Sequence, residues 1–505
     1  MLAPLVDIQG LHISFDKAEV LSDFSLQIAE GEIVSVVGES GSGKSISALM
    51  SMGLLSPKAA VKSTSTKVLG HDVSMFSPTD WRTLRGKEIA MIFQDPMNAL
   101  HPSIRIGKQL EEVLEIHTTL SRDQRKLKVL RALEEVSIPE PEISAKKYPH
   151  QMSGGQRQRV VIAMAMLLEP KIIIADEPTT ALDKEVEATV LALLRTLVKE
   201  KSCALWFISH DLEVVSEFSD RLVVLYKGKT VEQGPAKEVF NSPKHPYTKG
   251  LLACRPPKMG RPYPLPVLSD FLQGDGAPKS AQLTAPKTGT KALHIEGLNI
   301  GYTVRKGWKK STKWVVQNLD VTLNSGETLG LIGPSGSGKS SIGRAVVDLV
   351  PSTFSIRNFE GNEGRVQFIF QDPSSALNRS HTIGRILDKV LSRHASELSA
   401  AGRKEKASAL LQEVGLRPSD LNKKPKDFSG GQRQRIGIAR ALAADPTVLI
   451  CDESVSALDV SVQAQVLNLL NGIKKNRGLS MIFISHDPDV IRYMCDRIQQ
   501  LTPLA

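Results

Sequence analysis

Two segments of the sequence combine glycines, a lysine and a serine in a spacing that suits phosphate binding. Residues 38–45 read GESGSGKS, residues 333–340 read GPSGSGKS, and each segment follows an apolar run. Glycines let such a loop wrap so that successive backbone N–H groups face the phosphates, at the positive end of the next helix. The residues expected to form these two phosphate loops are Gly38, Glu39, Ser40, Gly41, Ser42, Gly43, Lys44 and Ser45, and Gly333, Pro334, Ser335, Gly336, Ser337, Gly338, Lys339 and Ser340.

The last two residues of each loop have chemistry of their own. Lys44 and Lys339 are expected to reach the β- and γ-phosphates of a nucleoside triphosphate. Ser45 and Ser340 are expected to ligate Mg²⁺ through their hydroxyl groups. The chemistry indicated is therefore the binding of a magnesium nucleotide, at two places in one chain.

An acidic pair follows a second kind of apolar run in each half of the chain. Residues 171–175 and 447–451 are apolar and partly β-branched, as expected of buried parallel strands. We expect Asp176 and Asp452, the first acids of the two pairs, to hold Mg²⁺ directly or through water. Glu177 and Glu453 are expected to orient and polarise the attacking water, because phosphoryl transfer depends on positioning and charge stabilisation.

These segments belong to a longer internal repeat. FQDP, SGGQRQR, the acidic pair followed by ALD, and FISHD all occur twice and in the same order. In both copies the serine of SGGQRQR lies 24 positions before the second acid, and that acid lies 33 positions before the histidine. The interval from the loop lysine to the FQDP glutamine is 18 residues shorter in the second copy. The chain therefore contains a duplicated domain whose second copy lacks a peripheral segment.

Bulk properties agree with several soluble domains. At 505 residues the chain exceeds the size of one compact core, and 41% apolar with 23% charged residues is ordinary globular composition. The four cysteines show no CxxC spacing, which argues against a disulfide framework or a zinc site. We expect no signal peptide and no membrane-spanning helix. The net charge of +10 fits a solvated surface, phosphate ligands, anionic lipid headgroups or RNA, and charge alone does not choose among them.

The elements that position these residues are expected to form two domains, residues 1–255 and 291–505. Residues 256–290, called the tether below, are rich in proline and are expected to be partly extended and poorly packed.

The repeated SGGQ segments point to a family. Residues 152–156 (MSGGQ) and 428–432 (FSGGQ) resemble the signature motif of ABC ATPases. The resemblance implies two α/β P-loop NTPase domains, each with a mainly parallel sheet, an antiparallel β subdomain and a helical signature subdomain. It also implies that the two cassettes pair head to tail, each signature loop capping ATP on the other cassette's phosphate loop. The signature residues are Ser153, Gly154, Gly155 and Gln156, and Ser429, Gly430, Gly431 and Gln432.

Other residues match family positions one by one. His210 and His486 match the switch histidine that contacts the γ-phosphate. Gln94 and Gln371 match the Q-loop glutamine, which links Mg²⁺ and water to a transmembrane partner. Phe15 and Tyr302 match the aromatic residue that stacks on adenine, although a phenylalanine at such a position could simply belong to the core. Because both copies keep the glutamate, histidine and signature serine, we expect two hydrolytically competent sites with ATP and Mg²⁺ as ligands.

Two functions fit a tandem ABC protein. One is the motor of a membrane transporter, and the other is a soluble protein that acts on ribosomes or nucleic acid. The zinc-binding cysteines of excision-repair types and the long charged helical linker of translation-factor types are absent from this sequence. The two copies instead resemble the two ATPases of bacterial peptide and nickel importers, and their fusion resembles the tandem ATPases of microcin C and oligopeptide importers. HPYT at residues 245–248 is rather specific to that group.

An importer implies partners outside this chain. These are two membrane-spanning permeases and an extracytoplasmic substrate-binding protein, with no nucleic acid expected. The cassettes are then expected at the cytoplasmic face of the inner (plasma) membrane as peripheral subunits. Peptides are the favoured cargo, with nickel, glutathione or another small solute as alternatives. The second copy ends 19 residues after His486 and has no counterpart of the VEQGP…HPYT region, so its last strands are expected to be missing or supplied differently.

Overall fold

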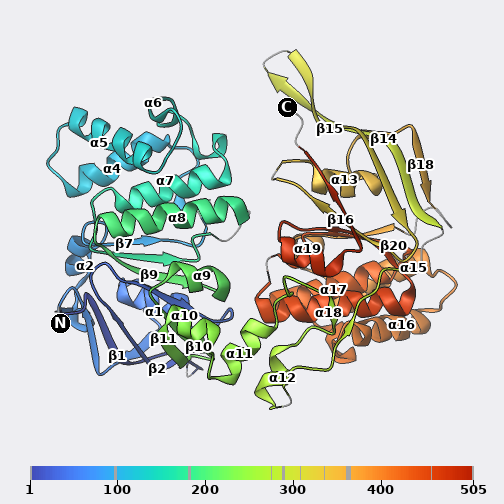
Figure 1. Cartoon of the computed structure of the whole chain (residues 1–505), viewed down its shortest axis with the longest axis horizontal. Helices are drawn as coiled ribbons and strands as arrows, with labels where there is room; N and C mark the ends of the chain where they lie inside the picture. Colours follow the sequence, from blue (N-terminus) through green and yellow to red (C-terminus); the bar gives the residue numbers. More distant parts are fainter. Residues whose placement is uncertain are drawn as a thin grey trace. The chain divides into compact units, whose positions relative to one another are not determined.

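The computed structural model describes residues 3–16, 18–95, 99–179, 184–274, 276–286, 290–306, 309–334, 336–359, 366–456 and 458–502. The chain divides into two compact units, residues 1–252 and residues 253–505. In Figure 1 the first runs from blue to green and the second from yellow-green to red. Each unit contains a mainly parallel sheet with helices on its faces, a separate antiparallel sheet and a group of helices. This confirms the predicted fold class.

The central sheet of the first unit has six strands in the order β11-β10-β3-β9-β8-β7. All pairs are parallel except β10 with β11. Every residue of β3 is buried, as a strand covered on both faces requires. The bounds are β3 Ile33–Val37, β7 Ile89–Ile92, β8 Ile172–Asp176, β9 Ala204–Ser209, β10 Arg221–Tyr226 and β11 Lys229–Pro235. Because β3, β7, β8 and β9 are parallel, the residues that follow them meet at one edge of the sheet.

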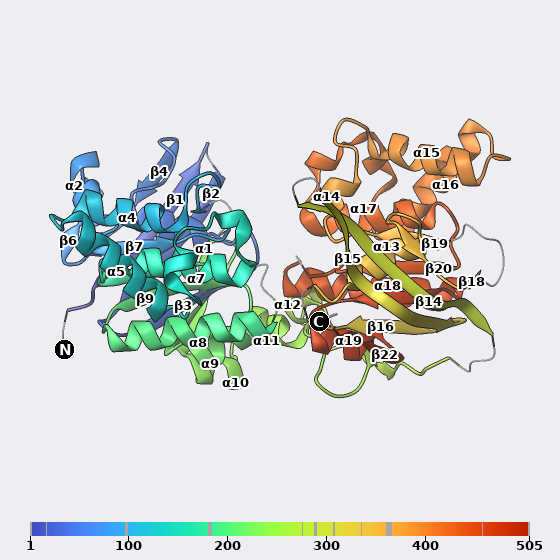
Figure 2. The same ribbon diagram turned by 90° about the horizontal axis from the view of Figure 1, so that it is seen from above.

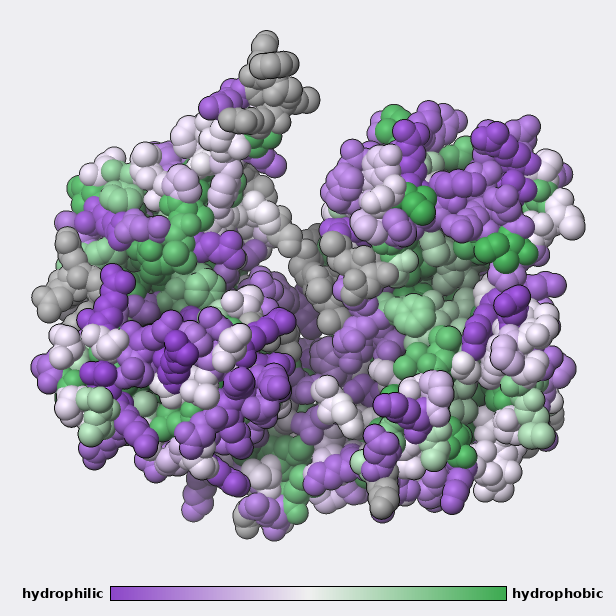
Figure 3. Space-filling model, turned by 180° about the vertical axis from the view of Figure 1, so that it is seen from behind, coloured by the Kyte–Doolittle hydropathy of each residue, from purple (hydrophilic) through white to green (hydrophobic). Residues whose placement is uncertain are grey.

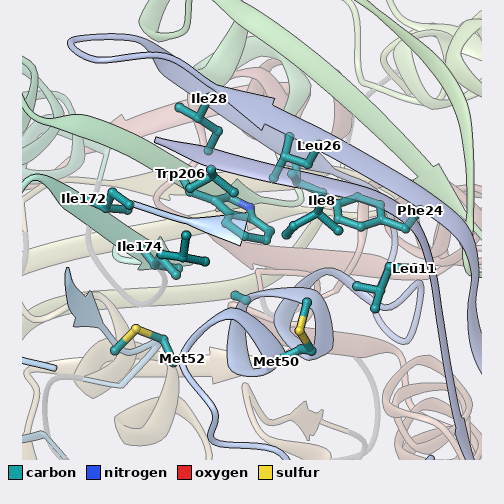
Figure 4. Packing of buried hydrophobic residues seen from close by; sticks show 14 of the residues in the cluster. Ile8, Leu11, Phe24, Leu26, Ile28, Met50, Met52, Ile172, Ile174 and Trp206 are labelled. Carbon is teal, nitrogen blue, oxygen red and sulfur yellow. The ribbon is translucent and has the colours of Figure 1, made fainter. Parts of the chain in front are cut away.

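An antiparallel sheet covers this core from one side. It comprises β1 (Val6–Phe15), β2 (Ala18–Ile28), β4 (Ala59–Lys62), β5 (Ser65–Val68) and β6 (His71–Asp72). Trp206 of β9 is fully buried where the two sheets meet, and its ring stacks on Phe24 with centroids 6.3 Å apart. Figure 4 shows this indole among side chains of both sheets, with a methionine of α1 and the methionine that follows α1 nearby: Ile8, Leu26, Ile28, Ile172, Ile174, Met50 and Met52. The helix that follows the phosphate loop therefore packs against this apolar core.

The helices of the first unit begin at recognisable caps. Ser121 and Gln124 form a capping box at α5, and Ser77 and Asp80 form one at α2. The helices are α1 Lys44–Ser51, α2 Pro78–Leu84, α4 Ile106–His117, α5 Arg122–Glu135, α6 Pro141–Ser144, α7 Gly154–Met166, α8 Lys184–Glu200, α9 Leu212–Phe218, α10 Ala236–Asn241 and α11 Pro246–Ala253, with 3₁₀ turns at Val73–Met75 and Pro149–Gln151.

The second unit repeats this plan with fewer elements. Its central sheet has five strands in the order β19-β20-β21-β16-β22, all parallel: β16 Thr328–Ile332, β19 Val366–Ile369, β20 Val448–Asp452, β21 Ser480–Ile484 and β22 Arg497–Gln500. Its antiparallel sheet contains β14 Lys291–Lys306, β15 Lys309–Asn324, β17 Ser352–Thr353 and β18 Ile356–Phe359. Within the described residues no strand pairs with β22 as β11 pairs with β10.

The helices of the second unit are α13 Lys339–Val346, α14 Pro373–Ala376, α15 Ile383–His394, α16 Ala400–Glu413, α17 Gly430–Leu442, α18 Val460–Arg477 and α19 Pro488–Met494, with 3₁₀ turns at Pro418–Asn422 and Pro425–Asp427. Figure 2 shows α15 and α16 at one end of this unit and β22 at the other. Between α13 and β19 the described residues contain two short strands and no counterpart of α2. In the described part of this shorter interval, the second copy also has no counterpart of β6 or of the 3₁₀ turn at Val73–Met75.

The first part of the tether packs more closely than expected. Leu265 and Leu268 are buried, and β12 (Pro262–Tyr263), α12 (Leu268–Leu272) and β13 (Ala281–Gln282) form within it. Arg261 donates to Asp496 Oδ1 at 2.7 Å and to the carbonyl of Tyr493 at 2.7 Å, at the end of α19. Proline-rich composition predicts an extended backbone, but it carries no information about which side chains find buried partners in a distant part of the chain.

The next features are the hydropathy of the surface and the state of the cysteine thiols. Figure 3 shows one face of the molecule, where hydrophilic side chains alternate with smaller apolar groups. Among the described residues, no helix is both long and apolar enough to cross a membrane. Cys203, Cys254, Cys451 and Cys495 are free thiols, and all of them are buried.

Candidate functional site

Each phosphate loop leaves the carboxyl end of a buried central strand and leads into a helix, α1 or α13. The lysine of each loop is buried and folds back over the loop. Lys44 Nζ donates to the carbonyls of Gly38 at 2.7 Å and Glu39 at 2.9 Å. In the second copy Lys339 Nζ donates to Gly333 at 2.6 Å and Pro334 at 3.1 Å. The ammonium group is thus held at the centre of the loop in both copies.

The first glycine of each loop permits a close approach of backbone to backbone. At Gly38 φ is +156°, and a Cβ there would lie 2.2 Å from the carbonyl oxygen of Leu225. At Gly333 φ is +159°, and a Cβ would lie 2.6 Å from the carbonyl oxygen of Leu501. Neither separation is possible for a real side chain, so both positions require glycine.

The loops fit a polyphosphate ligand. The hydroxyl groups of Ser42 and Ser337 are buried and have no hydrogen-bond partner among the described residues. An unsatisfied buried hydroxyl costs about 1–3 kcal/mol, a cost that a phosphate oxygen within reach would remove. Together with the lysine and the positive end of the following helix, these hydroxyls suit an anionic group with several acceptor oxygens.

The residues expected to ligate Mg²⁺ lie side by side. Ser45 Oγ donates to Asp176 Oδ1 at 2.9 Å, and Ser340 Oγ donates to Asp452 Oδ1 at 2.7 Å. Burial raises the pKa of the Asp176 carboxyl, the Ser45 hydrogen bond opposes this, and the neighbouring Glu177 raises it further. A hydroxyl and a carboxylate oxygen in contact are the hard ligands that Mg²⁺ prefers, so the donor set fits this ion.

Three side chains from three neighbouring strand ends converge in the first unit. Gln94 Nε2, after β7, donates to Glu177 Oε2 at 3.0 Å. His210 Nδ1, after β9, lies 3.3 Å from the same oxygen. The structure therefore brings together the predicted catalytic glutamate, the Q-loop glutamine and the switch histidine.

The second unit repeats this convergence. Gln371 Nε2 donates to Glu453 Oε2 at 2.6 Å, and His486 Nδ1 lies 3.7 Å from that oxygen. The neighbouring imidazole of His486 holds the pKa of the Glu453 carboxyl below its usual value, against the effect of burial. A glutamate kept ionised suits the orientation of a water molecule through a charged acceptor.

The backbone of both predicted catalytic glutamates is in the left-handed region. Glu177 has a φ of 45° and Glu453 a φ of 47°, conformations that cost a non-glycine residue of order 1–3 kcal/mol. The N–H group of each residue donates to a neighbouring strand, to Ile208 at 3.0 Å and to Ile484 at 2.9 Å. The left-handed conformation turns each glutamate out of the sheet at the point where its strand ends. No sequence motif indicated this conformation.

The signature segments begin helices α7 and α17. Ser153 Oγ accepts the N–H of Gln156 at 3.3 Å, while Gln156 Oε1 accepts the N–H of Ser153 at 3.1 Å. Ser429 and Gln432 form the same capping box at α17. Gly154 and Gly430 are the first residues of their helices. The structure thus places both predicted signature motifs at helix N-termini, where an anion is favoured.

The second signature glycine lets two helices pack closely. A Cβ at Gly155 would lie 2.5 Å from Val186 Cγ1 of α8, and one at Gly431 would lie 2.2 Å from Val462 Cγ1 of α18. A Cβ at Gly430 would meet no atom within 4 Å. Gly430 and Gly431 therefore form a matched pair for testing this contact.

Gly431→Ala is expected to destabilise the second unit by about 1–3 kcal/mol, because the added methyl forces α17 and α18 apart. Gly430→Ala is the control and should leave the unfolding temperature close to that of the parent. Thermal unfolding followed by circular dichroism measures both. Equal melting temperatures for the two variants would contradict the close helix contact.

The structure does not test the predicted adenine contacts of Phe15 and Tyr302. Phe15 ends β1 and is partly buried against the core of the first unit. Tyr302, on β14, is 36% exposed, and its hydroxyl lies 3.0 Å from Ser341 Oγ. Their role at adenine stays a prediction. Ser335 lies outside the described residues.

Several repeat-motif residues also lie outside the described part of the chain. They are Pro96, Ala181, Leu182, Asp183 and Ala457.

The two sites differ by an arginine near the second aspartate, a difference that the motifs did not indicate. Arg344 Nη2, on α13, lies 4.0 Å from Asp452 Oδ2, and its charge opposes the rise in the pKa of that carboxyl that burial causes. The corresponding position in the first unit is Leu49. Aligning the two copies position by position would have shown the change of charge, although not its contact.

The chain is similar to two protein-family models and to several known proteins. A family model described as ABC transporter matches residues 21–180 and 316–456, and one described as the C-terminal region of oligopeptide/dipeptide transporters matches residues 231–263. The chain is 41% identical to the uncharacterized ABC transporter ATP-binding protein YejF of Escherichia coli (strain K12), over 99% of this chain and 94% of that protein. It is 39% identical to the glutathione import ATP-binding protein GsiA of Escherichia coli (strain K12), over 97% of this chain and 84% of that protein.

Among solved structures, the complex of archaeal ribosomal stalk protein aP1 with archaeal ribosome recycling factor aABCE1 matches 97% of this chain and 87% of that chain. The TM-score is 0.61 and the sequence identity 20%, so this likeness concerns the fold alone.

Proposed function

We propose, from the premise that this chain belongs to the ABC transporter family, that it hydrolyses ATP at two magnesium-dependent sites to drive the uptake of peptides or related small solutes. The observation that carries the proposal is the convergence of lysine, aspartate, glutamate, glutamine and histidine at the sheet edge, once in each unit. ATP binding and hydrolysis follow from the family itself. The magnesium dependence and the residue roles are our proposal.

In this mechanism each side chain has one task. Lys44 and Lys339 neutralise the outer phosphates, and the loop N–H groups hold them in place. Mg²⁺, when bound, supplies positive charge against the phosphate oxygens, with Ser45, Asp176 and Gln94 as its proposed first-site ligands. The corresponding second-site ligands are Ser340, Asp452 and Gln371. Glu177 and Glu453 orient the attacking water, and His210 and His486, within 3.7 Å of these carboxylates, contact the γ-phosphate.

We propose that the two signature helices complete these sites by head-to-tail pairing of the cassettes. Ser153 and Ser429 cap α7 and α17, so each helix presents its positive end and a hydroxyl to an anion. A single chain that carries both cassettes raises their effective concentration for one another. ATP held between a phosphate loop and a signature loop would thus join the cassettes.

The cargo and the partners are argued from the relatives. A transporter ATP-binding protein implies membrane permeases as partners. The match of residues 231–263 to the oligopeptide/dipeptide transporter region supports peptides as cargo, and the import of glutathione, a tripeptide, by one relative agrees with this. We further propose an extracytoplasmic substrate-binding protein, and a peripheral position on the cytoplasmic face of the membrane.

Purification of the tagged full-length chain from native membranes in mild detergent tests this function. We expect two integral membrane proteins to accompany it, and the complex to hydrolyse ATP with Mg²⁺ but not with excess EDTA. Recovery with ribosomes and without permeases would support the competing class, a soluble protein acting in translation. The likeness to the ribosome recycling factor does not favour that class, since at 20% identity it shows only a shared fold.

A further inference from the structure

The HPYT segment, residues 245–248, is not used by the mechanism above, yet it contacts the first phosphate loop. Tyr247 is fully buried, and its hydroxyl oxygen accepts the backbone N–H of Glu39 at 3.0 Å. Its ring stacks on Tyr226 of β10, with centroids 4.3 Å apart. A side chain 208 positions away in the sequence therefore contacts the second residue of the loop.

This contact holds one peptide plane from both sides. The N–H of Glu39 and the carbonyl of Gly38 belong to the same trans peptide, so they point in opposite directions. The carbonyl accepts Lys44 Nζ at 2.7 Å, while the N–H donates to Tyr247. Tyr247 thus sets the orientation of the carbonyl that positions the phosphate-binding lysine.

The HPYT segment is itself held by hydrogen bonds. The carboxylate of Glu232 on β11 accepts the N–H of Lys244 at 2.7 Å and the N–H of His245 at 3.0 Å. His245 Nδ1 then accepts the N–H of Tyr247 at 3.1 Å. Because these bonds precede α11, they place Tyr247 at the start of that helix with its ring directed at β10 and the loop.

The second copy shows what replaces this arrangement. Its loop has Pro334 where the first has Glu39, and proline has no N–H group to donate. The carbonyl of Gly333 nonetheless accepts Lys339 Nζ at 2.6 Å. Within the described residues no counterpart of β11 or of the HPYT segment follows β22. The second loop, which has no tyrosine partner, thus also has no N–H group at this position that would need one.

We propose that Tyr247 is a positioning residue for the first ATP site, acting through the Glu39 N–H on the loop that holds Lys44. In the second site, the ring of Pro334 restricts the same part of the loop covalently. The inference rests on the proposed function, since it assigns the HPYT segment a role in nucleotide binding at one of the two sites. The loss of one hydrogen bond predicts a loss of affinity of about 3- to 10-fold, at the first site only.

The experiment uses the full chain and the fluorescent nucleotide mant-ATP with Mg²⁺. A Lys339→Ala background confines tight binding to the first site, and a Lys44→Ala background confines it to the second. Tyr247→Phe should raise Kd by about 3- to 10-fold in the first background and leave it unchanged in the second. Tyr226→Phe, which removes a hydroxyl from the ring stacked on Tyr247, is the matched control and should change neither.

A double-mutant cycle with Glu39 separates positioning from general destabilisation. Glu39→Pro copies the second loop and removes the N–H, so Tyr247→Phe should have no further effect in that variant. Glu39→Ala keeps the N–H and should remain sensitive to Tyr247→Phe. An equal effect of Tyr247→Phe with proline or alanine at position 39 would overturn the proposal.

Hydrogen exchange of the nucleotide-free chain provides a second readout. Tyr247→Phe should speed exchange of the Glu39 amide in a peptide that covers the first loop, with no change in the second loop. Unchanged exchange and unchanged Kd together would overturn the role of Tyr247, even if Glu39→Pro failed to fold. If the parent showed slow exchange that Tyr247→Phe accelerated, but bound no nucleotide, the positioning contact would stand and the proposed ATPase function would fail.

Discussion

Replacing Glu177 and Glu453 together by glutamine is expected to lower ATP hydrolysis by roughly 100-fold or more, the contribution of a positioned general base. Glutamine has nearly the same shape as glutamate, and its amide oxygen can still accept the hydrogen bonds that Gln94 and Gln371 donate at 3.0 and 2.6 Å. What is lost is the negative charge that orients and polarises water. Phosphate release from the purified full-length chain measures the effect.

The single variants test whether both sites work. Glu177→Gln and Glu453→Gln should each remove most of the turnover and still bind ATP, because the phosphate loops are unchanged. Glu200→Gln, an exposed glutamate at the end of α8, is the control and should keep parental activity. If either single variant kept the full rate, the claim of two competent sites would be wrong.

Replacing the two loop lysines is expected to have the next largest effect. Lys44→Ala and Lys339→Ala should each weaken ATP binding at their own site by roughly 10- to 100-fold, the value of a hydrogen bond to a charged group. Both ammonium groups are buried and lie over the loop carbonyls, so alanine also leaves Gly38 or Gly333 without its donor. Fluorescence titration with mant-ATP, in chains that also contain Glu177→Gln and Glu453→Gln, measures binding without hydrolysis.

Lys58→Ala, at an exposed position outside both loops, is the control and should bind like its parent. The double variant Lys44→Ala/Lys339→Ala should lose tight binding at both sites. Tight binding by that double variant would refute the proposed phosphate contacts, whichever residues hydrolyse ATP.

Much of the site could be predicted from spacing. Glycines, lysine and serine at fixed intervals allow few structures other than a phosphate loop, and two copies in register exclude chance. The acidic pairs were assigned correctly to strand ends, since β8 ends at Asp176 and β20 at Asp452. Each motif needs only a strand, a turn and a helix, which local sequence specifies well.

Other features depended on distant parts of the chain. The tether was expected to be poorly packed, yet Arg261 reaches Asp496, which is only 4% exposed. Composition could not show this, because the partner of a side chain in a folded chain is set by the fold around it. The contact of Arg344 with Asp452 could not be predicted from a motif either, because the two residues belong to different elements.

The sequence by itself determined that the chain has two ATP-binding cassettes with the same predicted catalytic residue types, because chemistry at a phosphate requires those residues at those intervals. The exchange of Glu39 for Pro334 is visible in the sequence, but only the tertiary structure showed what contacts depend on it. The loop of the first depends on Tyr247, which the parallel sheet brings to Glu39 through β10 and β11. The loop of the second has Pro334 and needs no such partner, and the reason is visible only from the contact between Tyr247 and Glu39.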